Sequence, residues 1–226
     1  MRIVKPENWK LYEIYTLFFV YLLLILSYFV LHDSLVSCFS AFFGITYTFL
    51  AGKGLPVCYL FGVSGSGLYG WLAYSNSLWG NLLLYVCYYI PMEIAGYFKW
   101  NKNLKKNKQE IVKTKLSGKE AAILFPVVIT ACVIFIFVLK TFGDSSPVAD
   151  GITTVLSVFG MYLTVKRCAE QWLIWIIVNG LSAIMWIILA INGTRAYSTV
   201  LMWVVYFILA IYFYNEWRKE LSKPQM

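Results

Sequence analysis

Eight long apolar segments constrain the fold of this chain more than any other feature of its sequence. A helix that spans a bilayer needs about 20 mostly apolar residues. Segments of this kind lie at about 11–31, 34–52, 55–74, 79–99, 121–141, 148–165, 171–192 and 197–216. They are too long and too uniformly apolar for the strands of a membrane barrel, which alternate over about 10 residues. The sequence therefore predicts an all-α integral membrane protein with eight transmembrane helices.

The overall composition agrees with this fold class. Hydrophobic residues make up 60% of the chain and charged residues only 13%, whereas a typical globular domain has about 45–50% and about 25%. The first apolar segment ends in YFVLHD and lacks a small-residue cleavage pattern. We therefore expect it to remain as a spanning helix and not to be removed as a signal peptide.

The positions of the basic residues predict the orientation. If the N-terminus is cytoplasmic, 17 of the 19 Lys and Arg residues fall on the cytoplasmic side, and only Lys140 and Arg195 fall outside. Such an excess is the usual signature of cytoplasmic loops. We expect both termini in the cytoplasm of a bacterial cell with the protein in its inner membrane. The basic segment KNKQEIVKTK is then a solvated cytoplasmic loop, and no nucleic-acid partner is indicated.

An internal repeat organises the segments. Residues 55–100 align without a gap on residues 172–217, and the identical pairs include Tyr89 with Tyr206 and Trp100 with Trp217. Together with the matching topology, this predicts two parallel three-helix repeats joined by an inverting helix, with the substrate site between them. The expected divisions are an extra N-terminal helix (1–33), the first repeat (34–100), a basic loop (101–120), the linker helix (121–147), the second repeat (148–217) and a tail (218–226).

Trp172, Trp175 and Asn179 lie on one face of the segment 171–192, because their spacing is i, i+3 and i+7. The tryptophans have an alternative interpretation as members of an interfacial aromatic belt. The asparagine has an alternative role as a hydrogen-bonding contact between helices, worth roughly 0.6 kcal/mol. If the repeat model is right, all three instead form one wall of a substrate site.

The segment 79–99 supplies a second candidate wall. Asn81, Tyr85 and Tyr89 recur there at helical spacing, and Glu93 is the only carboxylate well inside any predicted span. Ionisable residues at such depth are costly and usually face a cavity or a partner. A carboxylate beside aromatic faces suits an organic cation, through charge and cation–π attraction.

Two alternatives for Glu93 stay open. It could make a structural contact, or it could pair with Lys99 or Lys53, whose long side chains can reach into the membrane. Pro91 removes one helical hydrogen bond and frees the Cys87 carbonyl, so a kink is expected beside this residue.

The stretch GSGLYG, Gly65 to Gly70, matches the dinucleotide-binding pattern GxGxxG. That pattern has meaning only between a strand and a helix, and here it lies within a predicted span. We interpret the small residues as contacts that let helices approach closely, and some could also border the substrate path. The residues concerned are Gly62, Ser64, Gly65, Ser66 and Gly67.

Nothing in the sequence indicates an enzyme. The five cysteines are scattered, with no CxxC pair, so neither a metal site nor a disulfide framework is indicated. His32, the only histidine, lies at the end of a predicted span, and no catalytic triad or phosphate-binding loop is present. We expect no cofactor.

At this point the motifs resemble a known family. WLIWIIVNGLS resembles the helix of the bacterial PnuC-type vitamin transporters in which a WxxW element is followed by Asn and Ser, here Trp172, Trp175, Asn179 and Ser182. DGITTVLSVFGMYLTVKRCAEQW looks like the preceding helix of that family. CYLFGVSGSGLYGWLAY and LWGNLLLYVCYYIPMEIAGYFKW look like the counterparts in the first repeat. The resemblance covers roughly residues 34–220.

The resemblance implies a fold similar to that of SWEET sugar transporters, with a three-one-three helix plan, and the first helix of this chain is an addition to it. It implies facilitated diffusion, with a cytoplasmic riboside kinase that traps the product, and it leaves open a homo-oligomer such as a trimer. The family's binding residues carry over to Trp172, Trp175 and Asn179, with Ser182 in the same motif. Several members have Gln or Asn where this chain has Tyr85 and Glu93, which leaves the substrate open.

Glu93 favours a cationic substrate. Nicotinamide riboside and thiamine are cations with a flat ring, whereas riboflavin is neutral. We expect nicotinamide riboside first and thiamine second, and Asn179 could bond a carboxamide or a ribose hydroxyl. Nicotinamide mononucleotide is disfavoured because no Lys or Arg lies deep in a predicted span to meet its phosphate. The alternative to a self-sufficient transporter is a membrane binding subunit that needs an energising partner.

Overall fold

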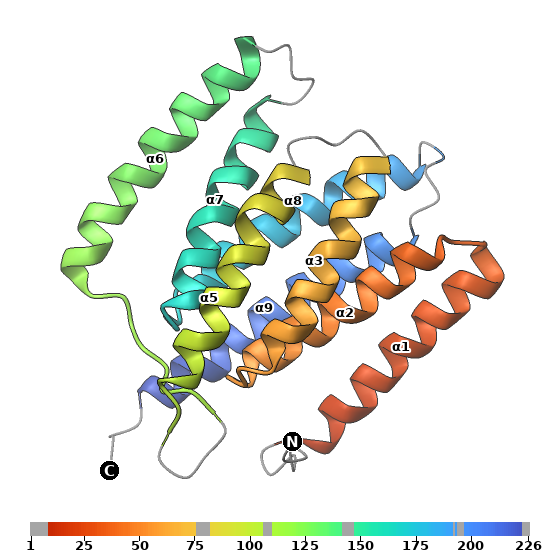
Figure 1. The fold of residues 1–226 in the computed structure, drawn as a ribbon, viewed down its shortest axis with the longest axis horizontal. Helices are drawn as coiled ribbons and strands as arrows, with labels where there is room; N and C mark the ends of the chain where they lie inside the picture. Colours follow the sequence, from red (N-terminus) through yellow and green to blue (C-terminus); the bar gives the residue numbers. More distant parts are fainter. Residues whose placement is uncertain are drawn as a thin grey trace.

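The computed structural model describes residues 9–75, 82–105, 110–141, 147–191, 193 and 197–222, and these residues are predominantly helical (Figure 1). The elements are α1 (Leu11–Leu31), α2 (Leu35–Gly52), α3 (Cys58–Ser75), η1 (Leu84–Tyr89), α5 (Ile90–Asn101), α6 (Gly118–Thr141), α7 (Pro147–Val165), α8 (Gln171–Ile191) and α9 (Tyr197–Leu221).

Each predicted apolar segment corresponds to one of these helices, with η1 and α5 together forming a single helical passage. Among the described residues, α1, α2, α6, α8 and α9 are long and apolar enough to cross a membrane. Predicted and observed ends differ by a few residues. The largest difference is in α9, which continues to Leu221 because its last turns carry polar residues that a search for apolar runs leaves out.

The passage η1–α5 contains a π-helical turn where a proline kink was expected. The main-chain N–H of Ile90 donates to the oxygen of Tyr85, five residues back. Pro91 follows directly and has no N–H to continue a regular helical ladder. The chain thus accommodates the proline by widening the preceding turn, a distortion that is frequent at functional sites.

The helices pack in a reciprocal pattern. Neighbours in the sequence pack together as α2 with α3, α3 with α5, α7 with α8, and α8 with α9. Across the bundle, α2 packs against α9 and α5 packs against α7. The remaining two helices lie at opposite edges (Figure 1): α6 packs on α7, and α1 packs on α2 and α9.

Most ion pairs gather at one end of the bundle, where α1, α6 and α8 begin and where α2, α5, α7 and α9 end. We call this the charged end. The pairs there are Lys10–Glu216, Lys53–Glu13, Lys105–Glu110, Lys105–Glu220, Lys113–Glu220, Lys166–Glu120 and Lys219–Glu216. The alternating direction of the helices thus brings residues from distant parts of the chain to the same side.

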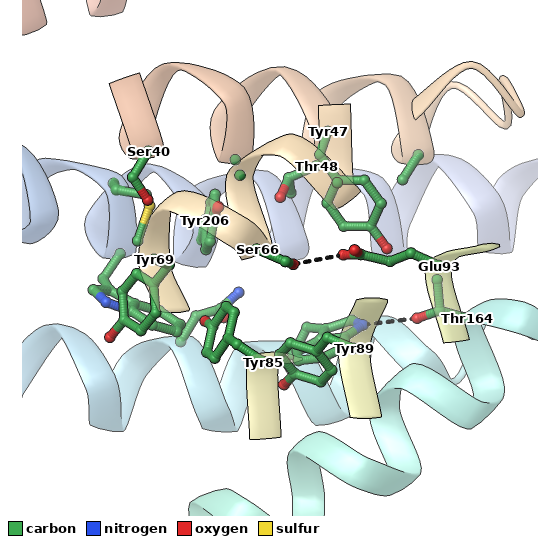
Figure 2. A pocket seen from close by; sticks show the side chains of 18 of the residues that line it. Ser40, Tyr47, Thr48, Ser66, Tyr69, Tyr85, Tyr89, Glu93, Thr164 and Tyr206 are labelled. Carbon is green, nitrogen blue, oxygen red and sulfur yellow. Dashed lines mark hydrogen bonds between the residues drawn. The ribbon is translucent and has the colours of Figure 1, made fainter. Parts of the chain in front are cut away.

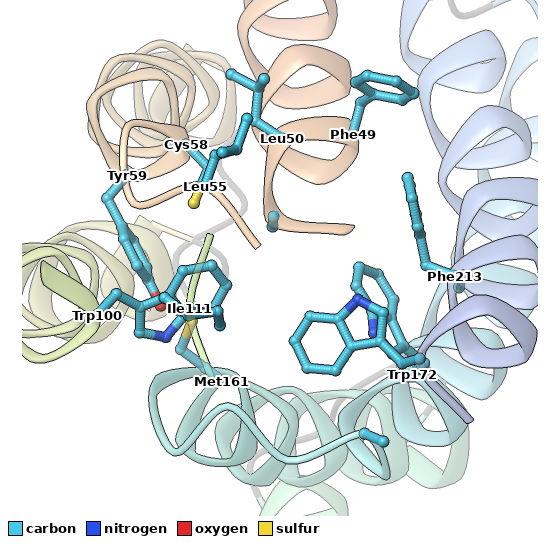
Figure 3. Packing of buried hydrophobic residues seen from close by; sticks show 14 of the residues in the cluster. Phe49, Leu50, Leu55, Cys58, Tyr59, Trp100, Ile111, Met161, Trp172 and Phe213 are labelled. Carbon is cyan, nitrogen blue, oxygen red and sulfur yellow. The ribbon is translucent and has the colours of Figure 1, made fainter. Parts of the chain in front are cut away.

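The core consists of two hydrophobic clusters. The charged-end cluster contains Phe49, Leu50, Ala51, Leu55, Cys58, Tyr59, Tyr89, Trp100, Ile111, Met161, Ala169, Trp172, Ala210, Phe213 and Trp217 (Figure 3). The opposite-end cluster contains Val20, Leu24, Ala41, Ile45, Tyr69, Ala183, Trp186, Met202, Trp203 and Val205.

One member of the charged-end cluster shows that the segment KNKQEIVKTK is not fully solvated, contrary to the prediction. Ile111 belongs to the segment expected to be a solvated loop, yet its side chain is 0% exposed, and Lys113 is buried as well. The segment was predicted to be solvated because most of its residues are basic or polar, but its one isoleucine packs into the core.

Candidate functional site

A cavity of about 90 Å³ lies between the two clusters (Figure 2). One water needs roughly 10–15 Å³ by the same measure, so the space can hold several waters or part of a small molecule. Helices from both halves of the chain contribute to its wall. The lining residues are Ser40, Gly44, Tyr47, Thr48, Ala51, Gly62, Gly65, Ser66, Tyr69, Tyr85, Tyr89, Glu93, Thr164, Gln171, Trp172, Trp175, Asn179, Met202, Trp203 and Tyr206.

Glu93 is the one acidic or basic side chain among these described lining residues, and it is 3% exposed. The Ser66 hydroxyl donates to its Oε1 atom at 2.9 Å. Its Oε2 atom has no hydrogen-bond partner among the described residues. The alternative in which a lysine pairs with Glu93 is not observed, because Lys53 binds Glu13 at the charged end and Lys99 is exposed. One carboxylate oxygen is therefore available to a ligand.

Gly62 makes room for this carboxylate. A Cβ atom at this position would lie 2.9 Å from Glu93 Oε1 and 2.9 Å from a ring carbon of Tyr47. The prediction that small residues allow close helix approach is thus confirmed for Gly62. It is also confirmed for Gly65, where a Cβ would lie 3.2 Å from the Gly44 nitrogen, but it is wrong for Gly67, which has nothing within 4 Å.

The π-helical turn aligns Tyr85, Tyr89 and Glu93 on the cavity. In a regular α-helix, residues eight positions apart differ in direction by roughly 80°. The wider turn of η1 advances each residue by a smaller angle, which offsets this drift. All three side chains consequently line the same cavity (Figure 2), and the ring of Tyr85 stacks on that of Tyr69 at 4.3 Å.

The α8 face contributes Trp172, Trp175 and Asn179 as predicted from their spacing. The Trp175 indole donates to the Thr164 hydroxyl at 3.0 Å, which fixes its ring against α7. Trp172 is only 2% exposed, so it is not a member of an interfacial belt. Its indole N–H has no partner among the described residues.

Of the predicted site residues that the structure describes, one is not in the wall. Ser182 is buried but does not line the cavity, and Asn81 lies outside the described residues. Ser182 was predicted from the family motif, and a sequence motif does not tell which of its residues a neighbouring helix covers.

Several residues that line the cavity were not among the site residues predicted from the sequence. Tyr206 could have been found, because the repeat alignment pairs it with the predicted Tyr89. Gln171, 1% exposed with an unpartnered side-chain NH₂ among the described residues, precedes the predicted Trp172. Nothing in the sequence pattern distinguishes Ser66 as the partner of Glu93, because that pairing depends on how α3 and α5 pack.

The arrangement contains no group of His, Cys, Asp and Glu side chains that could hold a metal ion, among the residues described. A cavity with a few polar side chains in a largely aromatic wall, enclosed by helices that are long and apolar enough to cross a membrane, is typical of a multi-pass membrane protein of the transporter class. Comparison with protein families matches residues 34–219 to the family described as nicotinamide mononucleotide transporter. The chain belongs to this family, which is one of transporters and not of enzymes.

Individual relatives agree with the family assignment. A protein of Haemophilus influenzae named nicotinamide riboside transporter PnuC is 30% identical over 221 residues, which is 96% of this chain and 94% of that protein. A protein of Neisseria mucosa with the same name is 30% identical over 84% of this chain and 74% of its own length. The crystal structure of a vitamin B3 transporter PnuC superposes with a TM-score of 0.84 at 27% identity, covering 94% of this chain and 92% of that one.

Proposed function

We propose that this protein transports nicotinamide riboside across the membrane and binds it in the cavity between the two halves of the bundle. The observation that supports this most directly is the buried Glu93 carboxylate, which has one unpartnered oxygen among the described residues and faces a cavity rich in aromatic rings. The pyridinium ring of the riboside is a flat cation, and both features attract it. The names of the relatives support the same substrate.

The charge of the cavity argues against nicotinamide mononucleotide, despite the description of the family. Its described lining residues include no Lys or Arg that could meet a phosphate. Thiamine, which is also cationic, is the second candidate, and neutral riboflavin is the third. These candidates differ in how strongly they depend on the Glu93 charge.

Polar groups around the cavity can form hydrogen bonds with the carboxamide and the ribose of the riboside. Asn179 offers an amide to the carboxamide or to a ribose hydroxyl. The unpartnered N–H groups of Gln171 and Trp172 offer two further donors. A buried donor without a partner costs about 1–3 kcal/mol, so a ligand that satisfies these groups regains part of that cost on binding. Ser182 is assigned no direct contact.

We further propose the three-one-three plan, with α2, α3 and η1–α5 as the first repeat, α6 as the inverting linker and α7, α8 and α9 as the second. The reciprocal packing of α2 with α9 and of α5 with α7 supports it. Helix α1 is then an addition at the edge of the first repeat. Movement of one repeat against the other would expose the cavity to each side in turn.

The distribution of basic residues supports a cytoplasmic charged end in the bacterial inner membrane, with both termini on that side. We propose transport by facilitated diffusion, with phosphorylation by a cytoplasmic riboside kinase that keeps the product from leaving. Assembly as a homo-oligomer such as a trimer is part of the same proposal.

Calorimetric titration of the purified protein with nicotinamide riboside, thiamine, riboflavin and nicotinamide mononucleotide tests the substrate. We expect micromolar or tighter binding of the riboside and a large loss of affinity in Glu93→Gln. Equal affinity for riboflavin, or unchanged binding in Glu93→Gln, would contradict the role of the charge.

Uptake into liposomes without ATP or an ion gradient then tests the mechanism. We expect nicotinamide riboside to enter the liposomes until its inside concentration equals the outside concentration. Binding without any uptake would instead favour a binding subunit that needs an energising partner.

A further inference from the structure

The described residues between α5 and α6 form a cover over the charged end of the bundle. We define the cover as residues 110–117. This stretch, EIVKTKLS, has the composition of a solvated loop. Ile111, near its beginning, is nevertheless 0% exposed, whereas the adjacent Val112 is 41% exposed. One side of the cover therefore faces the core and the other faces solvent.

Main-chain hydrogen bonds attach the cover to both halves of the bundle. The N–H of Ile111 donates to the oxygen of Gly54, just after α2, at 2.9 Å. The N–H of Thr114 donates to the Arg167 oxygen, and the Thr114 oxygen accepts from the N–H of Ala169, both at 2.9 Å. The cover consequently bridges the end of α2 and the turn between α7 and α8.

Side chains fix the same segment above the core. Ile111 packs into the charged-end cluster together with Trp100 and Trp172 (Figure 3). Lys113 forms an ion pair with Glu220, and its Nζ atom lies 5.0 Å from the ring centre of Trp217. Trp172 also lines the cavity, so the cluster that holds Ile111 separates the cavity from the charged end.

We propose that the cover is a gate and Ile111 its plug: the cover must leave the end of the bundle before a molecule in the cavity can pass to the charged side. The cover is joined to the helices and their connecting turns by hydrogen bonds, by the Lys113–Glu220 ion pair and by two buried side chains, those of Ile111 and Lys113. Releasing it leaves every helix intact, which makes it easier to displace than any helix of the bundle. This inference concerns the route and holds for any molecule that the cavity carries.

A native cysteine offers a direct test. The Thr114 hydroxyl oxygen lies 3.5 Å from the Cys168 sulfur, and the two residues are paired in a short parallel bridge. Thr114→Cys should therefore form a disulfide with Cys168 on oxidation. Because burial raises the pKa of the Cys168 thiol, the oxidation is run at mildly alkaline pH. The bond would lock the cover onto the turn between α7 and α8.

We expect the oxidised Thr114→Cys protein to lose at least tenfold in the rate of nicotinamide riboside uptake into liposomes, with recovery after reduction. Thr114→Cys combined with Cys168→Ser cannot form the bond and should transport equally under both conditions. Uptake at the full rate by protein shown to be completely cross-linked would overturn the gate.

A second measurement does not depend on the substrate. Ala51 lines the cavity at 2% exposure, and a cysteine introduced there reports access from the charged side to an impermeant maleimide. Ile111→Ala should raise the labelling rate at least tenfold, whereas Val112→Ala on the outer side of the cover should leave it unchanged. An equal rate with and without Ile111→Ala would also overturn the gate. If the wild type fails to bind or carry the riboside while this labelling result holds, the proposed substrate is wrong and the gate stands.

Discussion

Trp100 and Trp217 make the same hydrogen bond on opposite sides of the bundle. Trp100, at the end of α5, donates its indole N–H to the main-chain oxygen of Thr164 in α7 at 3.0 Å. Trp217, near the end of α9, donates to the main-chain oxygen of Gly52 in α2 at 2.6 Å. Both side chains are 0% exposed, and the gap-free repeat alignment pairs them. Each tryptophan thus ties the last helix of one proposed repeat to the first helix of the other.

The two tryptophans should therefore contribute similarly to stability. Trp100→Phe and Trp217→Phe each remove one buried hydrogen bond from an indole N–H to a main-chain oxygen, which contributes about 0.5–1.5 kcal/mol. We expect both variants to lower the thermal unfolding midpoint in detergent by comparable amounts. A large decrease in one variant with none in the other would show that the two contacts are not equivalent.

Substitution of Gly62 should weaken substrate binding. The Cβ atom of Gly62→Ala would lie 2.9 Å from Glu93 Oε1 and 2.9 Å from the Tyr47 ring, so the carboxylate has to move. Overpacking of this kind costs about 1–3 kcal/mol, and we expect the affinity for nicotinamide riboside to fall roughly tenfold. Calorimetric titration measures the change.

Gly67→Ala is the matched control for that experiment. It lies in the same helix, and a Cβ there has nothing within 4 Å. The control should bind as the wild type does. If Gly62→Ala also bound normally, the position assigned to the carboxylate would be wrong.

Thr164 should position Trp175. Its hydroxyl accepts from the Trp175 indole at 3.0 Å and donates to the Gly160 oxygen at 2.9 Å. Thr164→Val keeps the shape but removes the acceptor, and we expect a roughly tenfold loss of riboside affinity. Thr164→Ser retains the hydroxyl and should bind nearly normally. Equal affinities in the two variants would mean that the Trp175 ring is held by packing alone.

Glu13 should attach α1 to the core. Its buried carboxylate accepts from Lys53 at 2.6 Å and from the Tyr212 hydroxyl at 2.6 Å, which joins α1 to α2 and α9. Removing one partner of a buried pair costs about 3–5 kcal/mol, so Glu13→Gln should lower thermal stability markedly. Replacing both members by Glu13→Gln with Lys53→Met should recover part of the loss.

Lys10 provides the control for this pair. It binds Glu216 at the same end, but the two side chains are 45% and 33% exposed. Exposed pairs contribute about 0–1 kcal/mol, so Lys10→Ala should have little effect in the same melting experiment. A loss as large as that of Glu13→Gln would imply that the whole cluster acts as one unit.

The sequence alone predicted the helices because lipid imposes a simple rule. Each passage must be a long apolar run that satisfies its own main-chain hydrogen bonds, and such runs are visible without any knowledge of tertiary contacts. The same rule singled out Glu93, since an ionisable group within such a run is energetically costly and usually faces a cavity or a partner. The face of Trp172, Trp175 and Asn179 followed from helical spacing.

Only the tertiary structure decided what these residues meet. Glu93 lies against Ser66 and Gly62 because α3 and α5 pack closely, and the widened turn before Pro91 brings Tyr85 and Tyr89 onto the same side. Ile111 is buried although it lies in a segment rich in polar residues. Periodicity determines which direction a side chain points from its own helix. Whether it meets a cavity, a neighbouring helix or solvent depends on contacts between segments far apart in the chain, and these are set by packing of the whole bundle.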